Sequence, residues 1–264
     1  MKLKILLVSF TLTLLAGIAF FTLHPASQSP GFKTIPPAED DAGFVPYYIT
    51  RHLPSILQNH DALRQGFVNI KMRGYQGAGI ILEKGLVLTN AHVVVDENGR
   101  QRHRWYRVTL NGGGRAHATY VAHSRTYDVA LLRIPEDFGT PLPLADEDVT
   151  LHQPVMALGN PSRGDWVVSG DVKALSLMVR HKFVPDRSPR AVRMFVMGAQ
   201  PVQGYSGGPV VNPFTGQVVG ITVGLVARYV DPLTGKWVTP DKDVGVAMHI
   251  RDVLREVRKL KAAL

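Results

Sequence analysis

The chain has 264 residues and no cysteine, which excludes disulfide bonds, thiol catalysis and lipid attachment at a cysteine. Its 25 glycines and 18 prolines separate many short apolar stretches, which predicts an all-β protein. The formal net charge is +9, but no recognised nucleic-acid module is present, so we expect no nucleic-acid partner. The basic clusters at 100–107 and 180–193 are interpreted as solvated loops, with contact to anionic lipid or an acidic protein as the alternative.

The N-terminus has the pattern of a membrane-targeting segment. Lys2 and Lys4 precede residues 5–23, which carry no charge. Since about 20 apolar residues span a bilayer as a helix, residues 1–24 are predicted to be a signal anchor, with a cleaved signal peptide as the alternative. Positive residues stay on the cytoplasmic side, so the remainder is expected outside the cytoplasm, either anchored or secreted after cleavage.

Two segments connect this predicted anchor to the strands. Residues 25–45 are rich in proline, serine and acidic residues and are interpreted as a tether. Residues 46–65 are a possible helix, with Tyr47, Leu53 and Leu57 on its apolar side.

Short apolar runs between turn residues predict strands from residue 66 onward. These runs lie at Phe67–Lys71, Gly79–Leu82, Leu86–Thr89, Tyr106–Leu110, Ala118–Ala122, Val155–Leu158, Trp166–Ser169, Phe195–Met197, Val210–Val211, Val218–Val223 and Asp243–Met248.

The last segment of the chain has helical spacing. Its apolar residues fall at positions 250, 253, 254, 257 and 260, which predicts a C-terminal helix over 249–262. We expect this helix to pack on the preceding strands; a basic surface helix that contacts anionic lipid is the alternative.

Three segments carry candidate catalytic residues. An apolar strand leads through Thr89-Asn90-Ala91 to His92, and Asp128 precedes a nearly continuous apolar run. In Gly204-Tyr205-Ser206-Gly207-Gly208-Pro209, glycines permit a tight turn that exposes one hydroxyl beside backbone N–H groups. A serine nucleophile needs a base, and the base needs an orienting acid. Jointly, these segments favour a Ser-His-Asp triad.

The order and surroundings of His92, Asp128 and Ser206 resemble the trypsin-like serine peptidases. The Thr-Asn-Ala-His-Val-Val form without cysteine is most similar to the HtrA/Deg type. Further resemblance lies in three flanking segments: Gln76–Leu82, Val155–Pro161 and Gly216–Gly224.

The resemblance implies two six-stranded antiparallel barrels, at about 66–145 and 150–248, within a protease domain over 66–264. It implies His92 as general base and then acid, Asp128 as its orienting carboxylate, and Ser206 as nucleophile. The N–H groups of Gly204 and Ser206 would form the oxyanion hole.

The sequence departs from that family at two places. Tyr205 stands where an aspartate or asparagine is usual, and we consider an oxyanion loop that orders only when substrate or a partner arrives. Only sixteen residues follow Met248, so we expect no PDZ domain.

The substrate pocket is expected to be uncharged. Its walls would come from Gln200 and Val202 on one side and Thr222, Val223 and Gly224 on the other, which favours a small or medium apolar residue.

The resulting prediction is a serine endopeptidase that acts on extracytoplasmic proteins or peptides through an acyl-enzyme. The alternative is a catalytically silent or conditionally active binding or chaperone protein on the same fold. His117 and His123 lie in a predicted strand without a cysteine or acidic cluster, so we predict no metal site and no cofactor. A homotrimer is expected by analogy only.

Overall fold

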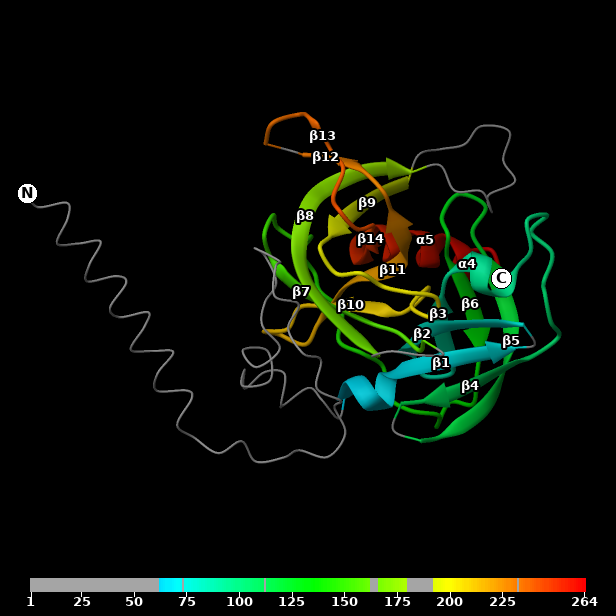
Figure 1. Ribbon diagram of the computed structural model, residues 1–264. Coiled ribbons are helices and arrows are strands. Elements are labelled where there is room, and N and C mark those ends of the chain that lie inside the picture. The colour runs from blue at the N-terminus through cyan, green and yellow to red at the C-terminus, as the bar shows by residue number, and fades with distance from the viewer. Residues whose placement is uncertain (1–61, 73, 112, 162–165, 180–191, 232) are drawn as a thin grey trace, which may run out of the picture. The chain divides into compact units, whose positions relative to one another are not determined.

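The computed structural model describes residues 62–264, apart from 73, 112, 162–165, 180–191 and 232 (Figure 1). The predicted anchor (1–24), the tether (25–45) and most of the possible helix (46–65) therefore lie outside the described residues. Of that possible helix, residues 62–65 are described, and they are helical together with Gly66. Over the described ranges, no helix combines the length and the apolar character that crossing a membrane requires.

The first barrel is closed by six antiparallel strands in the order β1-β2-β3-β6-β5-β4 (Figure 1). Alternation of side chains across each strand sends every second residue inward, so Val68, Ile70 and Val108 are fully buried. The strands are β1 (Phe67–Met72), β2 (Tyr75–Glu83), β3 (Leu86–Thr89), β4 (Tyr106–Leu110), β5 (Arg115–His123) and β6 (Ala130–Arg133).

The second barrel also has six antiparallel strands, in the order β10-β11-β14-β9-β8-β7, which confirms the predicted two-barrel fold. Its strands are β7 (Pro154–Leu158), β8 (Val167–Val179), β9 (Val192–Met197), β10 (Pro209–Val211), β11 (Val218–Val226) and β14 (Val244–His249). A small separate hairpin is formed by β12 (Tyr229–Val230) and β13 (Trp237–Val238).

Strand β8 is much longer than the predicted Trp166–Ser169. The prediction stopped where polar Asp171 and Lys173 interrupt the apolar run. In the structure these two side chains form an ion pair of 2.8 Å, and the strand continues through register shifts on β9. Pairing between polar neighbours thus allows a strand that the apolar pattern does not indicate.

Besides the helical residues 62–66, the structure describes two helices. The short α4 (Ala91–Val94) follows β3, and α5 (Ile250–Ala262) forms the C-terminal helix, as predicted (Figure 1). Ile250, Val253 and Val257 of α5 are buried, which agrees with the helical spacing of apolar residues. The helix also buries Asp252 and Glu256, a feature that the apolar pattern did not predict.

Candidate active site

The topology of the first barrel brings His92 and Asp128 together. Thr89 at the end of β3 pairs with Ala130 at the start of β6. Since the strands are antiparallel, the residues that follow Thr89 and precede Ala130 leave the barrel at the same end. His92 lies in α4, directly after β3, and Asp128 lies in the turn before β6.

Both carboxylate oxygens of Asp128 contact His92. Asp128 Oδ2 lies 2.6 Å from His92 Nδ1, and the His92 backbone N–H donates to Oδ1 at 2.9 Å. The Asn90 side-chain amide donates to the Asp128 carbonyl at 2.9 Å, and Asp128 is buried. This pairing assigns the Nδ1 proton to the bond with Asp128, which leaves Nε2 of the neutral imidazole as the basic atom.

The turn that carries Ser206 requires glycine on both sides. Gly204 has φ +107° and Gly207 has φ +83°, a region that other residues rarely adopt. A Cβ on Gly207 would lie 2.3 Å from both the Ala78 carbonyl oxygen and Thr89 Oγ1. The turn therefore packs directly on the strand ends that precede His92.

Backbone hydrogen bonds fix this turn to both barrels. The Ala78 N–H of the first barrel donates to the Ser206 carbonyl at 2.8 Å. The Gly207 N–H donates to the Thr222 carbonyl at 2.9 Å, and the Asn160 N–H donates to the Gly204 carbonyl at 2.9 Å. Three backbone hydrogen bonds thus connect the segment to residues of both barrels.

The functional groups of the turn remain available. Among the described residues, no group accepts a hydrogen bond from the N–H of Gly204 or of Ser206. The Ser206 hydroxyl donates a long bond of 3.3 Å to the Val223 carbonyl. Two unused N–H groups beside an exchangeable hydroxyl provide what an oxyanion hole and a nucleophile need.

Tyr205 is part of the core rather than of the surface. It is 1% exposed, and a Cβ on Gly159 would come within 2.2 Å of its ring. The Tyr205 N–H donates to the Val202 carbonyl at 3.1 Å, and its carbonyl accepts from the Gly208 N–H at 2.8 Å. The bulky ring therefore fits because residue 159 is glycine, a pairing that sequence reasoning missed.

The expected pocket residues differ in accessibility. Val202 is 52% exposed, whereas Gln200, Val223 and Gly224 are partly buried. A Cβ on Gly224 would meet no atom within 4 Å, so open space adjoins this residue. Thr222 is fully buried, and within the described part of the chain its hydroxyl has no hydrogen-bond partner. Thr222 therefore offers no accessible surface to a substrate in this structure.

A cavity of about 300 Å³ adjoins His92 on the first-barrel side. The Arg102 guanidinium lies 4.3 Å from the centre of the Tyr75 ring, and both residues line the cavity. The remaining lining residues are Asp96, Glu97 and Asn98. No motif in the sequence indicated this cavity, because its residues come from separate segments.

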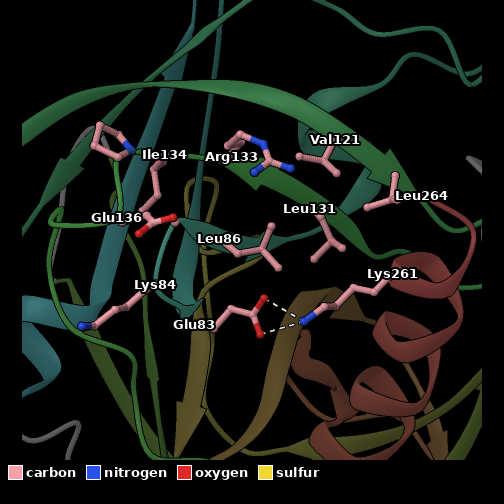
Figure 2. Close-up of a pocket in the computed structure, with 12 residues that line it drawn as sticks. Glu83, Lys84, Leu86, Val121, Leu131, Arg133, Ile134, Glu136, Lys261 and Leu264 are labelled. Atoms are coloured by element: carbon pink, nitrogen blue, oxygen red, sulfur yellow. Dashed lines mark hydrogen bonds and ion pairs between the residues drawn. The ribbon is translucent and has the colours of Figure 1, made fainter.

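A second cavity, of about 350 Å³, has no lining residue in common with the cavity beside His92 (Figure 2). It is lined by Leu86 and Arg133, which pair at the opposite end of β3 and β6 from Thr89 and Ala130. Figure 2 shows the Glu83 carboxylate joined to the Lys261 ammonium of α5, at 2.7 and 2.8 Å. This cavity is not part of the candidate active site.

Comparison with known proteins supports the resemblance. Serine protease Rv3671c of Mycobacterium tuberculosis is 29% identical over 151 residues, which cover 56% of this chain and 36% of that protein. A probable periplasmic serine endoprotease DegP-like of Halomonas elongata is 33% identical over 186 residues, which cover 68% of this chain and 35% of that protein. The chain thus matches about a third of the length of these curated relatives.

Solved structures share the fold. The active form of the Rv3671c protease from M. tuberculosis superposes with a TM-score of 0.63 at 23% identity, covering 90% of this chain and 93% of that one. Residues 77–221, which include all three candidate catalytic residues, match the trypsin-like peptidase domain. The chain therefore belongs to the trypsin-like peptidase family, with serine proteases of the HtrA/Deg type among its relatives.

Proposed function

We propose that this protein is a serine endopeptidase that hydrolyses peptide bonds through an acyl-enzyme. The observation that carries the proposal is the two-point contact between Asp128 and His92, at 2.6 and 2.9 Å, next to the glycine-flanked Ser206 turn. A carboxylate held this way fixes the imidazole tautomer and stabilises the imidazolium that forms during acyl transfer.

In the first step, Ser206 Oγ attacks the carbonyl carbon of the scissile bond while His92 Nε2 takes the hydroxyl proton. Because Oγ donates to the Val223 carbonyl in this structure, the step includes rotation of the hydroxyl toward His92. The N–H groups of Gly204 and Ser206 stabilise the oxyanion. As the carbon–nitrogen bond breaks, His92 returns the proton to the leaving amine.

In the second step, water attacks the ester carbon of the acyl-enzyme. His92 takes a proton from this water and then gives it to Ser206 Oγ as the ester bond breaks, which regenerates the enzyme. Every proton passes through His92, so the reaction needs no cofactor.

The proposed substrates are proteins or peptides outside the cytoplasm, with a small or medium apolar residue on the acyl side of the cleaved bond. The uncharged pocket residues Gln200, Val202, Val223 and Gly224 support this preference. The predicted anchor or signal segment at 1–24 and the periplasmic name of the Halomonas relative support the location. A homotrimer is proposed by analogy with the family alone.

Cleavage of a peptide library by the full-length protein tests this function. We expect cleavage after small or medium apolar residues by the wild type, with a matched Ser206→Ala variant inactive. A protein that binds peptides but cleaves none, with Ser206 unreactive, would instead be the binding or chaperone protein that was the alternative.

A further inference from the structure

One outward face of the first barrel carries basic residues in cross-strand register. Lys71 of β1 pairs with Arg107 of β4, and Arg107 pairs with His117 of β5. All three side chains are exposed. Two further exposed arginines lie in the adjacent cross-strand rows. Arg115 pairs with Thr109, and Arg133 pairs with Thr119. We call these residues, together with Trp105, the basic face: Lys71, Trp105, Arg107, Arg115, His117 and Arg133. The basic cluster at 100–107, which was expected to be a loop, therefore extends into β4 at Arg107.

This arrangement is unfavourable unless something compensates the charge. Neighbouring strands lie about 4.8 Å apart, and like charges directly opposite each other destabilise a sheet. Strands β1, β4 and β5 contain no acidic residue. Among the described residues, no carboxylate lies within ion-pair distance of Lys71, Arg107, Arg115 or Arg133.

An exposed aromatic ring lies among these cations. Trp105 is 51% exposed, and its ring centre is 4.7 Å from that of His117. A tryptophan ring beside cationic side chains suits a membrane interface, where the ring sits at the level of the lipid headgroups. Arg133 at the margin of the face also lines the cavity of Figure 2, whose wall includes apolar Leu86 and Val121.

We propose that the basic face docks on an anionic membrane surface. The cations are spread over four strands as separate points, which matches a field of phosphate headgroups better than one small ligand. The barrel is closed, so these strands offer no free backbone edge on which a peptide could add a strand. The proposal is independent of peptidase activity.

The test uses the full-length protein in nanodiscs that contain brominated lipid, which quenches nearby tryptophan. Replacing Trp166 and Trp237 by phenylalanine leaves Trp105 as the only tryptophan. We expect strong quenching of Trp105 in discs with phosphatidylglycerol, weak quenching in neutral phosphatidylcholine discs, and loss of the difference in high salt. The comparison isolates charge, because residues 1–24 are the same in both discs.

Arg107→Glu with Arg115→Glu should abolish the quenching in anionic discs. Each cation near an anionic surface contributes a factor of about five, so two reversals should weaken docking by roughly thirtyfold or more. The matched control, Lys236→Glu with Lys242→Glu, makes the same charge change at exposed positions outside the basic face, in the β12–β13 hairpin and in the turn before β14, and should leave the quenching intact. If the variant with Arg107→Glu and Arg115→Glu does not fold, the variant with Arg107→Gln and Arg115→Gln takes its place.

Equal quenching of Trp105 in neutral and anionic discs would overturn the proposal. So would quenching that survives both Arg107/Arg115 variants. Absence of lipid quenching together with Arg107-dependent binding of poly-glutamate would overturn it in favour of an acidic polypeptide partner. Peptidase activity measured in the same samples reports separately on the proposed function.

Discussion

The Ser124 hydroxyl donates a hydrogen bond of 2.5 Å to Glu256, across 132 positions of the sequence. Both residues are buried. The Ser124 oxygen also accepts the N–H groups of Thr126 and Tyr127 at 2.9 Å, so it organises the turn that ends at Asp128. Helix α5, which follows the second barrel, thereby supports the turn that carries Asp128, the proposed orienting carboxylate.

Glu256→Ala should therefore lower kcat with little change in KM. It leaves the Ser124 hydroxyl buried without its acceptor, at a cost of about 1–3 kcal/mol in the free energy of unfolding, and it loosens the Asp128 turn. Glu256→Gln keeps an acceptor oxygen and should retain most of the activity. Steady-state kinetics with urea unfolding checks both variants; equal kcat loss in Ala and Gln would contradict the positioning role.

Gly159→Ala should lower the free energy of unfolding by about 1–3 kcal/mol, because the new Cβ overlaps the buried Tyr205 ring. The matched control is Gly224→Ala, where the added Cβ meets open space. Thermal unfolding of the two variants is the measurement. A Gly159→Ala protein as stable as the control would show that Tyr205 does not pack on residue 159.

Stability should fall on acidification because of His249. Burial lowers the pKa of this imidazole below its ordinary value of 6.5, and the nearby Arg193 charge adds to the effect. Below pH 6.5 the unfolded chain takes up a proton that the folded protein does not. The free energy of unfolding therefore decreases by up to about 1.4 kcal/mol per pH unit until the folded-state pKa is reached.

Urea unfolding at pH 7.5 and pH 5 measures this contribution. His249→Gln keeps a donor for the Leu175 carbonyl, which His249 Nε2 contacts at 3.0 Å, but cannot be protonated in this range. The variant should show a smaller loss of stability between the two pH values.

Most of the strands and the C-terminal helix were predictable because their causes are local. Glycines at 204 and 207 mark a turn that only glycine permits, and the spacing in α5 identifies its buried apolar positions. His92 and Asp128 each adjoin an apolar strand, which limits where they can lie. Their roles remain proposals that rest on the geometry and the family.

The remaining features depend on tertiary docking. Glu256 and Asp252 are charged residues outside the apolar spacing of α5, but in the structure they are buried and contact Ser124 and Arg193. The fit between Tyr205 and Gly159 and the stacking of Arg102 on Tyr75 each join distant segments. No local pattern predicts such contacts, so the packing of Tyr205 against Gly159 could not be predicted from the sequence.

Asp128→Asn should lower kcat by several orders of magnitude while leaving the protein folded. The amide can no longer fix the required tautomer of His92 or stabilise its protonated form. The effect should persist at every pH between 6 and 9, whereas a merely structural defect would appear as lost stability in a thermal unfolding measurement. Unchanged kcat would remove Asp128 from the proposed triad.

The most direct test of the triad is covalent labelling of the full-length protein with a fluorophosphonate, read out by intact mass and peptide mapping. We expect one phosphonyl adduct, located on Ser206, formed quickly without any partner protein. Labelling should be absent in Ser206→Ala and slower by at least about a thousandfold in His92→Ala. No adduct on the wild-type protein, or equal labelling of the wild type and His92→Ala, would contradict the proposed triad.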